Sequence, residues 1–348
     1  MMGIVDAAFV IRYGQDRPNT IEQIGTMQIA ILADIHGNLA ALTAVMAELE
    51  RLQPDYVVVN GDLINAVPFS AEVIDLVRAQ NWVVVRGNHE FYYLDFGTSR
   101  AVEGSGDVAR WGQLHWLLER IRPDQGVYLG MLPDERVMFL PGTQPVSIAH
   151  GVPGHNRVGF YMEQSAASIA AELAHVRVQT VISAHTHVQV DRHIRVERDT
   201  DQDLFVDPTL DYFQGTAPVK RHWHVLNSGS VGMPLNGDPR AQFAIITDVP
   251  EAEVPGGWRA THYRVPYDRR SSLDAFTTSG MAAAGGVISQ LFYWSLVTAE
   301  SEVIRFFQWA RDFGYDPDRD MLGTFRAYCE QTGRDAYVRA RDPLYHPG

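Results

Sequence analysis

Short apolar runs that end in metal-ligand-type residues constrain this chain more than any other feature. The first run covers residues 28–33 and leads into Asp34 and His36. It is too short for a stable helix, so it predicts a buried strand. Residues two apart in an extended chain point to the same side, so Asp34 and His36 should project together from the carboxyl end of this strand. A carboxylate beside an imidazole suits a divalent metal ion. The alternative is an acid that caps the next helix, next to an exposed histidine.

The same pattern recurs further along the chain. Residues 39–52 have helical spacing, with Asn38 as the N-cap, and residues 70–80 predict a second helix. Strands predicted at 56–60 and 81–85 lead into Asp62 and into Asn88-His89, and strands at 146–149 and 180–183 lead into His150 and into His185 and His187. Alternating strands and helices predict parallel strands whose carboxyl ends share one edge.

Seven oxygen or nitrogen donors therefore follow five predicted strands. His150 alone would be read as an ordinary structural histidine, but the full set predicts a metal site: Asp34, His36, Asp62, Asn88, His150, His185 and His187. Seven donors exceed the needs of one tetrahedral zinc ion. Mixed N and O donors favour two ions of Mn, Fe, Zn, Ni or Co over Mg or Ca. One carboxylate must bridge such a pair, and Asp62 is the candidate.

The motif series resembles that of the calcineurin-like metallophosphoesterases. The matching residues are Asp34-Ile35-His36, Gly61-Asp62, Gly87-Asn88-His89-Glu90, His150 and His185-Thr186-His187. The resemblance implies an α/β fold, a four-layer αββα sandwich of two mixed β-sheets flanked by helices. It also implies that Asp34, His36 and His187 hold one ion, that Asn88, His150 and His185 hold the other, and that Asp62 bridges them. His89 would be the acid that protonates the leaving group, and Asp34 would orient it.

Two later segments look like signatures of the bacterial branch that includes small phosphodiesterases, namely 227–231 and 264–268. Two departures from the family pattern are also present. Ala184 stands where the family usually has glycine, which is expected to tighten the loop without removing a ligand. Leu63-Ile64-Asn65 follows Asp62 in place of the run found in Ser/Thr protein phosphatases, which disfavours a dedicated protein phosphatase.

The domain organisation is predicted from changes in composition and periodicity along the chain. Residues 1–26 are expected to be an N-terminal extension, 27–268 the metallophosphoesterase domain, and 269–348 a helical C-terminal appendix that packs on the sheets or on a second subunit. Within the domain, 191–222 predicts a long hairpin or insertion. The aromatic-rich segment 91–145, with a helix at 107–121, is a lid or cleft wall, or ordinary packing. Further strands are expected at 224–226, 242–247 and 263–267, and helices at 165–175, 287–313 and 320–331.

Composition narrows the range of partners and compartments. The formal net charge is −13, which argues against long nucleic acids and membrane surfaces. Cys329 is the only cysteine, so no intramolecular disulfide or cysteine-based zinc site is expected, and this usage suits the cytoplasm. The sequence predicts no membrane-spanning run and no secretory signal.

Together these features predict a dinuclear-metal phosphoesterase that acts on a small phosphodiester or nucleotide-type substrate. A hydroxide bridging the two ions, with Mn²⁺ favoured, would attack phosphorus, and His89 would protonate the leaving oxygen. The alternatives are a phosphomonoesterase, a nuclease, and a catalytically weak sensor or scaffold that works through its helical tail. Beyond the donors, His155, Asn156 and Arg157 are candidates to reach a phosphate, whereas His193, His222 and His224 are read as surface or strand histidines.

Overall fold

The strands form two five-stranded sheets. The computed structural model of the chain describes residues 26–198 and 219–345. The first sheet has the order β10-β9-β1-β2-β3, with β1 at Gln28–Leu32, β2 at Tyr56–Asn60, β3 at Val83–Val85, β9 at Ala241–Asp248 and β10 at Trp258–Val265. The second has the order β4-β5-β6-β8-β7, with β4 at Glu135–Met138, β5 at Val146–Ala149, β6 at Thr180–Ser183, β7 at Gln189–Arg198 and β8 at Val219–Ser228.

Both sheets are mixed. In the first, β1, β2 and β3 run parallel, β9 pairs antiparallel with β1, and β10 pairs antiparallel with β9. In the second, β5, β6 and β8 run parallel, and β4 and β7 join the edges as antiparallel strands. The predicted parallel crossovers are therefore present, and the donor-bearing strand ends are divided between two sheets.

Strand β1 is buried on both faces, which explains why its sequence is a continuous apolar run. Ile29 and Ile31 belong to the core between the sheets, together with Ile148, Ile182 and others. Ala30 and Leu32 face the opposite way and pack in the core beneath the helices.

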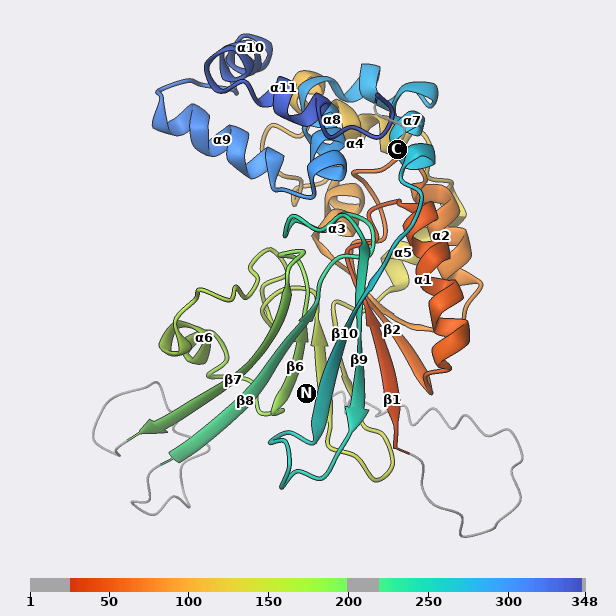
Figure 1. Cartoon of the computed structure of the whole chain (residues 1–348), viewed down its shortest axis with the longest axis vertical. Coiled ribbons are helices and arrows are strands. Elements are labelled where there is room, and N and C mark those ends of the chain that lie inside the picture. Colours follow the sequence, from red (N-terminus) through yellow and green to blue (C-terminus); the bar gives the residue numbers. More distant parts are fainter. Residues whose placement is uncertain (1–25, 199–218, 346–348) are drawn as a thin grey trace, which may run out of the picture.

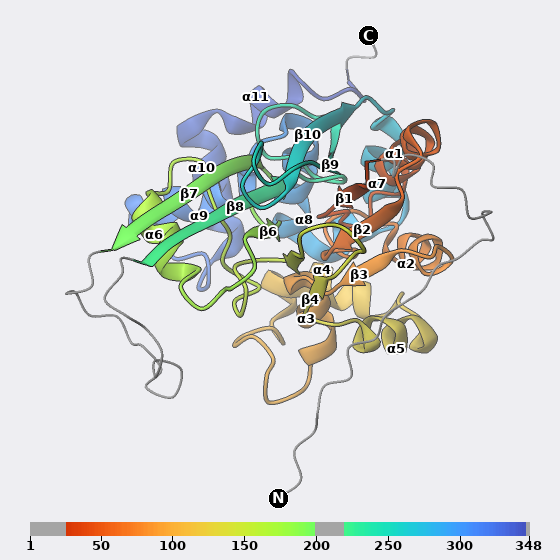
Figure 2. The same ribbon diagram turned by 90° about the horizontal axis from the view of Figure 1, so that it is seen from below.

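Helices cover the outer face of each sheet. Leu42 of α1 (Leu39–Leu52), Val73 of α2 (Ser70–Arg78) and Leu129 of α5 (Pro123–Met131) share the first sheet's outer core. Helix α6 (Ala166–Glu172) packs next to β7 on the second sheet, through a core that includes Ile169 and Trp223. The view from below separates α6, β7 and β8 from α1 and α2 on the opposite side (Figure 2). The expected four-layer αββα sandwich is confirmed.

A group of helices lies beyond the carboxyl ends of β1 and β2 (Figure 1). It contains α3 (Asn88–Asp95), α4 (Val108–Leu118) and the C-terminal helices α7 (Arg270–Thr278), α8 (Met281–Thr298), α9 (Glu302–Asp312), α10 (Met321–Thr332) and α11 (Arg334–Arg339). Helices α4 and α8 approach so closely that a Cβ on Gly112 would lie 2.1 Å from the Ala284 carbonyl oxygen. Ser272 of α7 donates a hydrogen bond to Asn38 at the start of α1. The predicted C-terminal helical extension is therefore present and packs on the sheet domain.

Several element predictions are wrong in detail. Residues 91–145 are more regular than expected, because they also contain α5 and β4. The strand predicted at 263–267 is β10, which begins earlier, at Trp258, and ends at Val265. The single helix predicted at 287–313 is two helices, because Ala299 has a left-handed backbone (φ 56°) that ends α8. Most aromatics of 91–145, such as Trp116 and Tyr128, pack in or against the core, as the packing alternative predicted.

One expectation about membranes also needs correction. Helix α8 is long and apolar enough, by length and composition, to cross a membrane. More than half of that stretch is buried inside the fold, as is usual for a core helix, so the finding is weak evidence for a membrane span.

Two predictions lie partly or wholly outside the described residues. The N-terminal extension falls almost entirely within residues 1–25, which the structure does not describe. Of the segment 191–222, the two ends form the hairpin arms β7 and β8, and residues 199–218 are not described.

Candidate functional site

The turns after β1, β2 and β6 have an unusual backbone. Five of the seven predicted donors have positive φ angles between 51° and 68°, namely Asp34, His36, Asp62, His185 and His187. Left-handed conformations in residues with a Cβ are uncommon and cost on the order of 1–3 kcal/mol each. Asp34 and His36 therefore do not converge through strand alternation, as the sequence predicted, because β1 ends at Leu32. Both residues instead have a left-handed backbone, with Ile35 between them, and their ligand atoms lie within 4.8 Å of each other.

Hydrogen bonds between neighbouring turns hold this backbone in place. The N–H groups of Asp34 and His36 donate to the carbonyls of Gly61 (3.1 Å) and Asp62 (2.9 Å). Gly87 packs so closely that a Cβ there would lie 2.2 Å from Oδ1 of Asp62. The turns after β1, β2 and β3 thus support one another.

Glu90 ties two of these turns together, a role that the sequence did not reveal. Its buried carboxylate accepts the backbone N–H groups of four residues: Asp62 (2.9 Å), Leu63 (2.8 Å), Ile64 (3.3 Å) and Gly87 (2.7 Å). Burial, followed by the nearby Asp62 carboxylate, raises the pKa of Glu90 to about 7. Its position two residues after Asn88 in the motif was the only available signal.

The segment after β8 supports the turns from the other side. Ser230 Oγ donates to the Asp34 carbonyl (2.7 Å), and Asn227 Nδ2 donates to the Ala184 carbonyl (2.9 Å). A Cβ on Gly232 would lie 1.8 Å from the Ile35 carbonyl oxygen, so only glycine fits there. Ala184 is buried and is not among the positive-φ residues, so its backbone does not require the glycine usual in the family.

The first donor set comprises Asp34, His36, Asp62 and His187, which are buried and have ligand atoms within 4.8 Å of one another. Nε2 of His36 lies 3.0 Å from Nε2 of His187, which in turn lies 3.5 Å from Oδ1 of Asp34. The Nδ1–H of His187 donates to the Met233 carbonyl (2.6 Å), which leaves the lone pair of Nε2 free to bind a metal ion. This arrangement suits a metal ligand.

The second donor set converges on the side-chain oxygen of Asn88. Nε2 of His150 lies 3.1 Å from Asn88 Oδ1, and Nδ1 of His185 lies 2.8 Å from the same atom. The Nδ1–H of His150 donates to the Asn60 carbonyl (2.8 Å), so its Nε2 faces the set.

The carboxylate of Asp62, a member of the first set, also reaches the second. Its Oδ2 atom is 3.6 Å from Nε2 of His36 and 3.3 Å from Nε2 of His150. Its Oδ1 atom accepts the backbone N–H of His89 (2.8 Å). The structure therefore brings together all seven predicted donors, with Asp62 at the centre.

Burial favours the uncharged imidazoles that metal ions require. It lowers the pKa of His187 to about 3 and that of His185 to about 4, and it lowers the pKa of His36 as well. His150 differs: burial acts in the same downward direction, but the carboxylates of Asp62 and Asp34 and the hydrogen bond with the Asn60 carbonyl together outweigh it and raise the pKa to about 10.

The residues present fit divalent metal ions. Both carboxylate oxygens of Asp34 and Nδ1 of His36 are buried without a hydrogen-bond partner among the described residues. Unpaired buried carboxylate oxygens are costly unless a cation neutralises them. Close imidazole pairs beside two carboxylates form a donor set for divalent transition metals.

His89 lies beside both donor sets. Its ring meets the His36 ring edge-on, with 4.7 Å between centroids, and it also meets the Tyr92 ring, with 5.2 Å between centroids. Nδ1 of His89 has no hydrogen-bond partner among the described residues, and neither does the Asp34 carboxylate, so no hydrogen bond joins the two. The predicted orientation of His89 by Asp34 has no hydrogen bond to support it, whereas Asp62 holds the His89 backbone.

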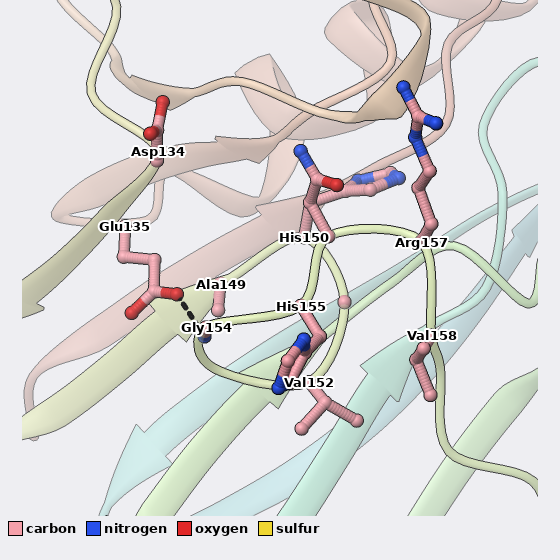
Figure 3. A pocket seen from close by; sticks show the side chains of 11 residues that line it. Asp134, Glu135, Ala149, His150, Val152, Gly154, His155, Arg157 and Val158 are labelled. Atoms are coloured by element: carbon pink, nitrogen blue, oxygen red, sulfur yellow. Dashed lines mark hydrogen bonds between the residues drawn. The ribbon is translucent and has the colours of Figure 1, made fainter. Parts of the chain in front are cut away.

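A cavity of about 410 Å³ opens next to His150. Asp134 and Glu135 lie on one side and Arg157 on the other (Figure 3). The Arg157 guanidinium sits 4.8 Å above the Tyr92 ring, so the cation stays near His89 without a carboxylate partner in the described part of the chain. His155 and Asn156 line the same cavity.

The fold and this site define the chain as a metal-dependent hydrolase of the α/β sandwich type. Residues 27–189 match the family model for calcineurin-like phosphoesterases. Over these residues the chain is similar to that family, and the match together with the buried Asp/His donor set supports a metal-dependent phosphoesterase.

The chain is also similar to individual proteins. The crystal structure of a metallophosphoesterase from Sphaerobacter thermophilus is 26% identical, with a TM-score of 0.51, and the match covers 74% of this chain and 99% of that one. A phosphoesterase from E. coli is 16% identical, covers 69% of this chain and 100% of its own, and has a TM-score of 0.34. An uncharacterized protein of Methanocaldococcus jannaschii is 22% identical over 63% of this chain and 82% of its own.

Proposed function

We propose that the chain hydrolyses a small phosphodiester or nucleotide-type substrate with two divalent ions bridged by Asp62. The central position of the Asp62 carboxylate carries this proposal. It lies within 3.6 Å of His36 in one donor set and within 3.3 Å of His150 in the other. The first ion would be held by Asp34, His36 and His187, and the second by Asn88, His150 and His185.

When bound, two such ions supply an activated water nucleophile and neutralise charge on the phosphoryl oxygens. The protein's own contribution is to fix the donors. The hydrogen bonds from His187 to Met233 and from His150 to Asn60 set the tautomers.

His89 is proposed to protonate the leaving oxygen. Its ring adjoins His36, and its backbone is tied to Asp62, so it stands beside both donor sets. Burial lowers the pKa of His89, whereas the Asp62 carboxylate acts to raise it. An anionic phosphate bound next to the ring would act in the same direction as Asp62 and favour the protonated form.

The cavity next to His150 supports a substrate with a second group on phosphorus. Its volume of about 410 Å³ lies within the usual range for small-molecule sites. Arg157 offers a cation for a phosphate oxygen, and Asp134 and Glu135 offer acceptors for hydroxyl or amino groups. These features favour a diester or nucleotide over a simple monoester. Mn²⁺ as the ion, a cytoplasmic location and a homo-oligomer through the C-terminal helices stay predictions.

The test combines metal content with hydrolysis of bis(p-nitrophenyl) phosphate. The chelator-treated chain should be inactive and should recover activity with Mn²⁺. Asp62→Ala should lose at least one ion per chain by elemental analysis, while Asp312→Ala, an exposed acid on α9, should match the wild type. Full metal retention by Asp62→Ala would refute the bridging role.

A further inference from the structure

A second group of histidines lies on the hairpin formed by β7 and β8. In register, His193 of β7 is opposite His224 of β8, and Arg195 is opposite His222. Residues two apart on a strand share a face, so Asp191 and His193 lie on the same face as His222 and His224. The opposite face of the hairpin carries Trp223 and Ile194, which pack in the core beneath α6.

The polar side chains on this face contact one another directly. Nε2 of His224 lies 2.8 Å from Oδ1 of Asp191, and Nδ1 of His193 lies 3.1 Å from Nε2 of His222. The rings of His193 and His224 are stacked with 4.1 Å between centroids. One ligand atom each from Asp191, His193 and His224 lies within 4.8 Å of the others.

This group is separate from the phosphoesterase donors. The turn that carries His187 ends where β7 begins, at Gln189. With a rise of about 3.3 Å per residue, the strand carries His193 about 13 Å beyond Gln189. None of its members belongs to either donor set around Asp62.

The cluster has the chemical character of a cation site. The ring of His224 is fully buried, and its Nδ1 atom has no hydrogen-bond partner among the described residues.

Asp191 and His193 are exposed, so their side chains can close on an ion. Donor atoms bound to one zinc ion at 2.0–2.2 Å lie roughly 3.4 Å apart, which requires only small rotations from the spacing found here. His222 contacts Nδ1 of His193 and so leaves Nε2 of His193 as the ligand atom. Arg195 is exposed on the same face and can turn its charge to solvent.

We propose that Asp191, His193 and His224 bind one divalent transition-metal ion of the zinc type, with His222 positioning His193. The ion would join β7 to β8 and lock the register of the hairpin. Two imidazoles and one carboxylate are a donor set that zinc accepts, with water completing the coordination.

The test compares zinc content in four full-length proteins. The wild type, Asp191→Asn, His193→Ala and the control His175→Ala are stripped with a chelator, dialysed against Zn²⁺ and measured by mass spectrometry of the metal. His175 is an exposed histidine outside the cluster. Asp191→Asn and His193→Ala should each hold one zinc ion fewer per chain than the other two proteins.

Because the measurement is a difference between variants, it does not depend on what the enzyme hydrolyses or on how many ions the other site holds. Both cluster variants should keep their Mn²⁺-dependent phosphoesterase activity within about twofold. Equal zinc content in all four proteins would overturn the proposal and leave a histidine cluster held by hydrogen bonds alone.

Discussion

Asp62 and His150 meet across the two sheets, with 3.3 Å between Oδ2 of the carboxylate and Nε2 of the ring. Asp62 follows β2 of the first sheet, and His150 follows β5 of the second. The site is therefore complete only when the sheets pack against each other through the core around Ile31, Val58 and Ile148.

Replacement of His89 should affect leaving groups unequally. If His89 donates the proton to the leaving oxygen, His89→Ala should slow hydrolysis of an alkyl phosphodiester by roughly 10²–10⁴-fold. A p-nitrophenyl ester needs little protonation and should be slowed far less. Steady-state kinetics on both esters, with metal content measured in parallel and His175→Ala as the control, checks this. An equal loss on both esters would contradict the role.

Arg157 should act on substrate binding. Its guanidinium stands over Tyr92, next to His89, and has no carboxylate partner among the described residues. A charged hydrogen bond of about 1.5–3 kcal/mol implies that Arg157→Ala raises KM roughly 10- to 100-fold. Arg157→Lys should recover part of this loss, and Arg177→Ala, an exposed arginine elsewhere, should behave like the wild type. An unchanged KM would exclude Arg157 from the substrate site.

Glu90 has no proposed role in catalysis, but its replacement should lower the free energy of unfolding. Glu90→Gln replaces one acceptor oxygen with an amide that faces backbone N–H groups, leaving buried donors unpaired. The expected cost is about 3 kcal/mol in the free energy of unfolding. Urea denaturation in the presence of a chelator measures this without a contribution from metal binding. Glu50→Gln, on the surface of α1, is the matched control, and an equal midpoint in both variants would refute the prediction.

The loop between β8 and β9 should contribute to acid sensitivity. A side-chain hydrogen bond from Arg240 lowers the pKa of Asp238 to about 2. In the unfolded chain this carboxyl titrates near pH 3.9, so the unfolded state takes up the proton first as the pH falls. The stabilisation is complete above about pH 5 and declines toward pH 2. Urea unfolding from pH 6 to pH 3 should show a shallower pH dependence for Asp238→Asn than for Asp312→Asn, and identical slopes would contradict the assignment.

The sequence predicts the framework of the site well, for physical reasons. Buried parallel strands are continuous apolar runs, so β1, β2, β5 and β6 and the polar residues after them can be recognised directly. The N-cap role of Asn38 is likewise local, and its side chain accepts the Ala41 N–H as expected.

Other features depend on contacts between distant segments and could not be predicted. The left-handed backbone at Asp34 and His36 exists because the carbonyls of Gly61 and Asp62 hold it. The four hydrogen bonds to Glu90 have no local signature. In the exposed strand β4 only Met138 is buried, so β4 lacks the apolar run by which a buried strand can be recognised in the sequence.

The histidines of the hairpin illustrate the same limit. His193 and His224 are 31 residues apart in the sequence, and only the β7–β8 register places them opposite each other. The sequence alone suggests isolated surface or strand histidines. In the structure His224 is fully buried, and His193 stacks on both His222 and His224 on one face of the hairpin.

The central claim is that two divalent ions lie on either side of Asp62, and anomalous diffraction from crystals grown with Mn²⁺ tests it most directly. The account predicts two peaks about 3.5–4 Å apart, one among Asp34, His36 and His187 and the other among Asn88, His150 and His185, with Asp62 contacting both. A single peak, or two peaks of which one lies out of reach of the Asp62 carboxylate, would contradict it.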